Sequence, residues 1–226
     1  VVFLVSALLI GWFFVTVTGK KLSVVPSKRQ FMAEGAFDFV RNTIGRDIIG
    51  SKDFMRFVPL LLTCFTLILF NNVAGIIPFI QYPSTGRIAF PIVLTVIVYI
   101  TYHVAAVKAK GGFGKYMGSL IPPGLPGWLK PIMFVLEFLT YFIIRPLTLA
   151  LRLFGNMLAG HMALVLFIMG GWFLVNSGPL LAIAGAGSWI MGLLMTFFEI
   201  LIQGLQAYVF TLLSASYIGS SLSEDH

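Results

Sequence analysis

Five ionisable side chains lie within the longest apolar stretches of this sequence: Glu137, Arg145, Arg152, His161 and Glu199. Ionisable groups in such stretches are costly, and they usually mark an ion or substrate pathway. An arginine keeps its proton at any physiological pH, so Arg152 can attract a carboxylate but cannot relay a proton. These residue types predict a path for a charged species that is interrupted by a fixed positive charge.

Helical spacing, at about 100° per residue, sorts the polar side chains into faces. Arg145 and Arg152 are seven residues apart and share one face, and Asn156 lies close to it. His161 follows Arg152 by nine residues and therefore points to the far side. A second polar stripe occupies the last apolar stretch, and its members are Glu199, Gln203, Gln206 and Tyr217.

The positions along the chain predict two polar half-paths that stop at Arg152. Glu137 lies near the start of its apolar stretch, and Arg152 is nearly central. His161 and Glu199 approach the centre from the other end. Structural roles remain open alternatives: an Arg152–Glu199 ion pair, a core histidine at 161, a snorkelling Arg145, and helix–helix hydrogen bonds by the amide side chains.

The composition excludes a soluble protein. Of the 226 residues, 58% are hydrophobic and only 10% are charged, whereas soluble domains carry about 25% charged residues. The net charge of +7 does not indicate nucleic acid as a partner, because the basic residues lie between apolar runs. Cys64 is the only cysteine, so we expect no disulfide and no cysteine metal site. No metal and no cofactor is expected.

We predict an all-α integral membrane protein with one domain spanning 1–226. Five apolar segments are long enough to cross a bilayer, namely 1–18, 57–80, 88–107, 131–175 and 179–222. The last two have 45 and 44 residues, about twice the length that a bilayer requires. No long polar turn divides either segment. They predict a hairpin of two long, tilted helices, bent at Pro146 or at glycines.

Two of the segments that connect the apolar stretches differ in their predicted structure. Apolar residues recur at helical spacing in 31–50, which predicts an amphipathic helix at the membrane surface, with a short solvated helix as the alternative. The loop 108–130 is rich in glycine and proline and cannot be one continuous helix. The first segment lacks the basic start of a signal peptide, and we expect a few residues to precede it.

The lysines and arginines predict the orientation. Eight lie between Lys20 and Arg56, and four more lie in the loop 108–130. Basic connections face the cytoplasm, so the N-terminus is expected outside and the C-terminus inside. A bacterial plasma membrane is favoured, with the mitochondrial inner membrane as the alternative.

Two sequence stretches together resemble subunit a of F-type ATP synthases. They are "RPLTLALRLFGNMLAGH" at 145–161 and "FEILIQGLQAYVFTLL" at 198–213, and the stretch 57–78 is similar to this family's second membrane segment. The resemblance implies that the chain is the stationary part of a membrane motor and is not an enzyme on its own. It also implies that Arg152 is the essential arginine facing a carboxylate on a rotating ring of c subunits.

The resemblance assigns further residues to proton access: Asn156, His161, Glu199 and Gln206, with Glu137 on the cytoplasmic side. Gln203, on the same stripe as Glu199 and Gln206, is included in the predicted proton path. Arg145 and Tyr217 are auxiliary. At positions 161 and 199 some relatives carry an acid first and a histidine second. Here the order is reversed, with His161 first and Glu199 second, so either could handle the proton. The implied partners are the c-ring, peripheral-stalk b-type subunits, the rest of the ATP synthase and the lipid bilayer. Na⁺ as the coupling ion, or a self-contained proton-coupled transporter, are the rival interpretations.

Overall fold

The structure, a computed structural model, describes residues 2–18, 27–50, 53–76, 86–121 and 126–222. Throughout these residues the regular structure is helical, as predicted, and no strand occurs among them. In chain order the α-helices are α1 (Val2–Thr18), α2 (Lys28–Asp38), α3 (Val58–Ile76), α4 (Ala89–Ala109), α5 (Phe113–Gly118), α6 (Lys130–Leu139), α7 (Arg145–Asn176) and α8 (Pro179–Leu222).

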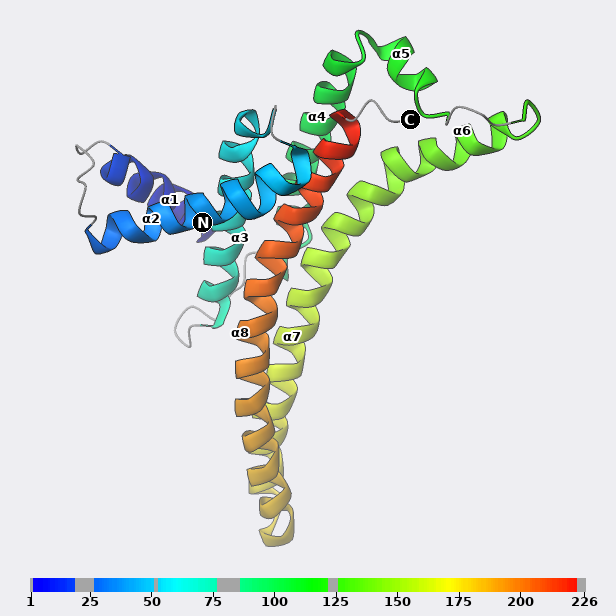
Figure 1. Cartoon of the computed structure of the whole chain (residues 1–226). Coiled ribbons are helices and arrows are strands. Elements are labelled where there is room, and N and C mark those ends of the chain that lie inside the picture. The colour runs from blue at the N-terminus through cyan, green and yellow to red at the C-terminus, as the bar shows by residue number, and fades with distance from the viewer. Residues whose placement is uncertain (1, 19–26, 51–52, 77–85, 122–125, 223–226) are drawn as a thin grey trace.

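The two longest helices form a hairpin that extends well beyond the other helices (Figure 1). A continuous helix of 47 residues runs from Lys130 to Asn176, and α8 adds 44 residues. At 1.5 Å per residue, each is more than about 60 Å long, twice the thickness of the hydrocarbon core. At the turn, Gly178 has a φ of 143°, which other residues rarely adopt. The predicted hairpin of 131–175 and 179–222 is confirmed.

The first helix of the hairpin bends just before Pro146, as the sequence predicted. Residues Thr140–Ile144 (η4) form a π-helical turn between α6 and α7. Beyond this turn α7 runs beside α8, whereas α6 diverges from it (Figure 1). The bend follows from Pro146, which lacks an N–H and whose ring collides with the carbonyl one turn earlier in a regular α-helix.

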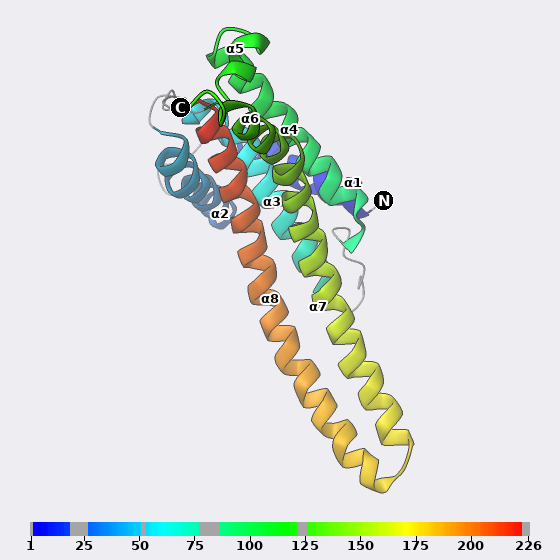
Figure 2. The ribbon, with the colours of Figure 1, turned by 90° about the vertical axis from the view of Figure 1, so that its right-hand side faces the viewer.

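Helices α3, α4 and α7 pack around the C-terminal half of α8, and Figure 2 shows this group from the side. Their apolar side chains form one core. Its fully buried members are Ile68 of α3, Val98 of α4, Leu153 of α7, and Ala207, Phe210 and Ile218 of α8. This core fixes the rotation of α7 about its own axis, because Leu153 occupies the inward face.

Four helices of the described chain are long and apolar enough to span a bilayer, rather than the five predicted. They contain Val58–Gly75, Ala89–Ala109, Lys130–Asn176 and Pro179–Leu222. The apolar part of α1, Leu4–Val17, is shorter than such a span. A membrane-crossing role of the first helix therefore remains a prediction.

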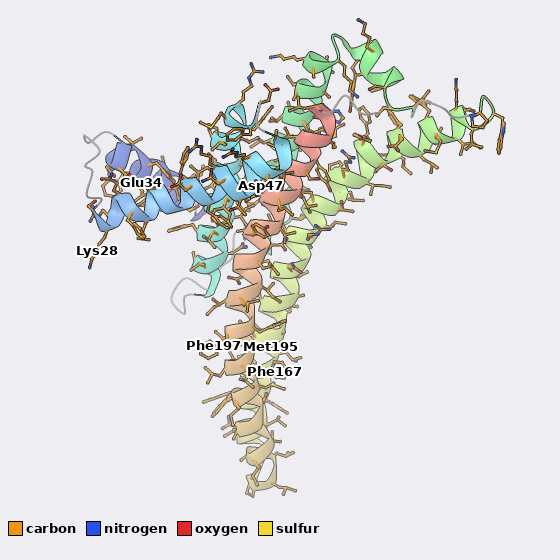
Figure 3. The ribbon with its side chains drawn as sticks, in the orientation of Figure 1. Lys28, Glu34, Asp47, Phe167, Met195 and Phe197 are labelled. Carbon is orange, nitrogen blue, oxygen red and sulfur yellow. The ribbon has the colours of Figure 1, made fainter. Side chains whose placement is uncertain are left out.

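Most of the segment predicted as an amphipathic helix, 31–50, is helical and contains buried residues. The helix starts at Lys28, and α2 continues into a second π-helical segment, Phe39–Ile49 (η1). Val40 and Ile44 are fully buried against Leu61 of α3 and Ala215 of α8. Lys28, Glu34 and Asp47 are distributed along its length (Figure 3). Its position at a membrane surface remains a prediction.

The loop 108–130 is interrupted, as its glycines and prolines predicted. Helix α4 extends two residues into it, to Ala109, and α5 is short. Gly111 and Gly112 have φ values of 73° and 139°, which favour glycine and separate the two helices.

Candidate polar path between the hairpin helices

Arg152 lies on the exposed face of α7. Its neighbour Leu153 is fully buried, and Met157 is 3% exposed, so Arg152 and Asn156 are turned away from the core. Arg152 has no hydrogen bond or ion pair with any described residue. The alternative of an Arg152–Glu199 ion pair is therefore wrong. A charged side chain on this face is available to a group outside the chain.

Three polar side chains of α8 form the predicted stripe and are buried against α7. Glu199, Gln203 and Gln206 are 5%, 3% and 5% exposed. The Gln203 side-chain amide donates a 3.1 Å hydrogen bond to Glu199 Oε1 and a 3.6 Å bond to Met157 Sδ. The carboxylate is thus held by an amide one helical turn away.

The stripe is connected to the exposed face of α7 by one hydrogen bond. Asn156 Nδ2 donates to Gln206 Oε1 at 2.7 Å. Asn156 is one turn beyond Arg152 and close to its face. The contact therefore joins the buried carboxylate–amide stripe to the surface that carries Arg152.

A cavity of about 190 Å³ lies along this stripe. Three buried polar atoms on its lining residues have no hydrogen-bond partner within the described part of the chain: Glu199 Oε2, Gln203 Oε1 and Gln206 Nε2. Buried polar atoms normally bind protein groups or ordered water. A cavity of this size has room for several waters, and those waters would satisfy these atoms. The lining of the cavity thus offers unpaired donors and acceptors to ordered water.

Two residues of the site were missed by sequence reasoning. Asn72 of α3 is 1% exposed, lines the cavity and donates a hydrogen bond of 3.4 Å to the main-chain carbonyl of Gln203. The signal was the consecutive pair Asn71–Asn72 within an apolar segment. Gly160 of α7 lies against the carboxylate, because a Cβ built there would be 3.0 Å from Glu199 Oε1.

Two predicted path residues are not brought to this cavity. His161 is half-buried, does not line the cavity and has no hydrogen bond to a described residue. Glu137 lies on α6, beyond the bend, and is also half-buried. The structure therefore groups Asn156, Glu199, Gln203 and Gln206. His161 lies outside the cavity but close enough to Glu199 to interact with it electrostatically, whereas Glu137 is apart from the group.

The auxiliary residues Arg145 and Tyr217 do meet. The Arg145 guanidinium lies 3.6 Å from the Tyr141 ring centre and 5.0 Å from that of Tyr217. Its Nη1 also donates to Ser220 Oγ at 3.1 Å. Arg145 is thus bound between the two hairpin helices by cation–π contacts, and it does not extend away as a snorkelling side chain would.

The hairpin exposes a large apolar surface beyond the cavity. Met195 lines the cavity and Phe167 lies nearby on the facing helix, whereas Phe197 is 66% exposed and points away from α7 (Figure 3). Exposed aromatic and aliphatic side chains of this extent require lipid or another protein as their surroundings. This fold and site define an integral membrane protein with a polar path beside an unpaired arginine.

Comparison with known proteins agrees with this class. The family model described as ATP synthase A chain matches residues 1–219. The ATP synthase subunit a of Nocardioides sp. is 42% identical, over 99% of this chain and 81% of its own length. Those of Rhodococcus erythropolis and Streptomyces lividans are 42% and 40% identical, over 98% of this chain and 80% and 77% of their own lengths. The chain belongs to the ATP synthase A chain family.

Proposed function

We propose that this chain is the stator subunit a of a rotary F-type ATP synthase, where it couples proton translocation to rotation of a c-subunit ring. The observation that carries the proposal is the unpaired Arg152 on an exposed face that Asn156 shares, together with the hydrogen bond from Asn156 to Gln206, which lines the same cavity as the buried Glu199. Family membership supports the same role. The subunit has no catalytic activity of its own and acts within the complete synthase.

Arg152 acts on the ionisation of a carboxylate carried by the ring. A carboxyl group must be neutral to pass through lipid, because a bare charge there is costly. When it reaches Arg152, the fixed positive charge stabilises its ionised form. The proton is then released into one half-path, and the group takes up another proton after it has moved on. Arg152 also repels a proton that would cross directly between the half-paths.

The cavity beside α8 forms one half-path. Glu199 is its titratable member, and the side chains of Gln203, Gln206 and Asn156 orient water between Glu199 and the Arg152 face. Side-chain amides do not ionise, so they orient the water that carries the proton but do not bind the proton themselves. Glu137, on the other side of Arg152 in the chain, belongs to the second half-path, and His161 modulates the first.

The basic residues favour one orientation. Arg56, Lys108 and Leu222 line the same groove of about 710 Å³, so the start of α3, the end of α4 and the end of α8 share one side. By the positive-inside rule this side is cytoplasmic, and the C-terminus lies there. We place the protein in a bacterial plasma membrane, with the c-ring, b-type stalk subunits and the remaining F1Fo subunits as partners.

The test is ATP-driven acidification of inverted membrane vesicles that carry Arg152→Ala, with Thr148→Ala on the same exposed side as the control. We expect Arg152→Ala to abolish pumping while the complex still assembles, and to increase the passive proton leak once F1 is removed. Thr148→Ala should pump normally, because the Thr148 hydroxyl bonds only to its own helix. Normal pumping by Arg152→Ala would overturn the proposal.

Two further measurements separate the rival functions. Pumping that requires Na⁺ and produces Na⁺ uptake, rather than acidification, would identify Na⁺ as the coupling ion. Transport by the purified chain alone, reconstituted without a ring, would indicate a self-contained transporter instead.

A further inference from the structure

The π-helical turn before Pro146 leaves one main-chain carbonyl without a helical partner. The Tyr141 carbonyl would accept from the N–H four residues ahead in an α-helix, or five ahead in a π-helix. The N–H of Arg145 instead donates to the Thr140 carbonyl, and Pro146 has no N–H. An unsatisfied carbonyl is costly in a membrane-spanning segment.

Tyr102 of α4 supplies the missing donor. Its hydroxyl donates a hydrogen bond of 2.7 Å to the Tyr141 carbonyl, and its side chain is only 1% exposed. Its ring packs edge-on against Tyr99 and Tyr217, with centres 5.5 Å and 6.2 Å away. These contacts help to fix the orientation of the Tyr102 side chain.

The same turn is also held from α8. The Tyr141 ring lies under the Arg145 guanidinium, and Arg145 in turn donates to Ser220. Tyr141 is therefore bound through its carbonyl by α4 and through its ring by Arg145. Of the two contacts, the one to the carbonyl depends on the π-helical geometry, because this geometry leaves the carbonyl without a helical donor.

We propose that Tyr102 is a positioning residue that preserves the π-helical turn and thereby sets the relative directions of Glu137 and Arg152. A π-turn contains one residue more than an α-turn. If it closed into a regular α-helix, all side chains of α7 would rotate by about 100° relative to those of α6. Either Arg152 or Glu137 would then leave its face. This inference rests on the proposed roles of those two residues.

The first experiment compares Tyr102→Phe with Tyr99→Phe in the assembled synthase. Tyr99 lies on the same helix, and its hydroxyl has no hydrogen bond to a described residue. The readout is the ratio of ATP-driven proton pumping to ATP hydrolysis. We expect Tyr102→Phe to lower this ratio about threefold to tenfold, the factor that corresponds to one lost hydrogen bond. Tyr99→Phe should leave it unchanged, and equal ratios in both variants would overturn the proposal.

The second experiment restores the donor within the helix. Pro146→Ala provides a main-chain N–H that reaches the Tyr141 carbonyl in the π-helical register. In this background Tyr102→Phe should change the ratio of pumping to hydrolysis little, because the Tyr141 carbonyl no longer depends on the tyrosine. An equal loss with and without Pro146→Ala would show that the hydroxyl does not act through this carbonyl, and it would overturn the proposal.

A distance measurement tests the bend independently of proton transport. Spin labels at Val135 of α6 and Leu166 of α7, both exposed, report the relation of the two helices in a Cys64→Ala background. We expect the distance to change in Tyr102→Phe and to stay the same in Tyr99→Phe. An unchanged distance would overturn the positioning role. If the distance changes in Tyr102→Phe but Arg152→Ala pumps normally, the positioning role stands and only the proposed function is contradicted.

Discussion

The side-chain amide of Asn156 donates a hydrogen bond of 2.7 Å to the side-chain carbonyl oxygen of Gln206, across the interface of α7 and α8. Gln206 is 5% exposed, and Asn156 lies on the exposed side of α7. This bond is the point where a buried stripe of α8 reaches the face that carries Arg152. Its removal should separate a structural role of the amides from a role in conduction.

Asn156→Ala should lower ATP-driven pumping while the synthase still assembles. The substitution leaves both polar atoms of the Gln206 side chain without a protein partner, at a cost of about 1–3 kcal/mol in a buried site. Asn156→Ser, which retains a short donor, should recover part of the activity with water as a bridge. Acidification of inverted vesicles measures both variants. Pumping at the wild-type rate in Asn156→Ala would mean that the bond is only a packing contact.

Gly160→Ala should impair pumping more than Gly170→Ala on the same helix. A Cβ at Gly160 would lie 3.0 Å from Glu199 Oε1 and 3.2 Å from its carboxyl carbon, whereas a Cβ at Gly170 meets nothing within 4 Å. The added methyl group would push the carboxylate away from its position beside Gln203. Pumping assays on both variants, normalised to assembled complex, check this. Equal rates would show that the Glu199 side chain moves aside freely.

Glu199→Gln should reduce pumping far more than His161→Gln. Glu199 lines the cavity and has a buried carboxylate oxygen without a protein partner, and the substitution preserves its shape while removing its titration. His161 lies outside the cavity. The measurement is the pumping rate of each variant and of the doubly substituted protein. A larger loss in His161→Gln would assign proton transfer to the histidine, and Glu199 would then not be the titratable group of this half-path.

Gly185→Ala should destabilise the far end of the hairpin, whereas Gly187→Ala should not. A Cβ at Gly185 would lie 2.6 Å from Val175 Cγ2 and 2.8 Å from the Gly171 carbonyl oxygen, and one at Gly187 meets nothing within 4 Å. Overpacking of this kind costs about 1–3 kcal/mol. Thermal unfolding of the complex, with limited proteolysis at the Asn176–Gly178 turn, provides the readout. Equal stability of the two variants would mean that the helices separate there without cost.

The sequence predicted the elements and faces of this protein better than the contacts between them. Helical periodicity placed Glu199, Gln203 and Gln206 on one stripe, and segment length indicated the hairpin. The contact of Asn156 with Gln206 depends on how far α7 slides along α8. That register is set by close packing at Gly171 and Gly185, residues that periodicity does not relate to the site.

Asn72 shows a second limit of prediction from the sequence. It is close to the stripe only because α3 packs against α8, a contact between residues 131 positions apart in the chain. The π-helical turn was also beyond prediction in its detail. Pro146 indicated that the helix bends, but the partner of the orphaned carbonyl, Tyr102, comes from another helix and is fixed by tertiary packing.

The Arg145–Ser220 hydrogen bond has a mechanical consequence. It joins the start of α7 to the end of α8, and the Asn176–Gly178 turn joins the two helices at their other end. The two helices are therefore joined to each other at both ends, and neither can slide along the other without breaking this hydrogen bond or opening the turn. A lateral pull on Arg152, seven residues from Arg145, would consequently be shared between α7 and α8.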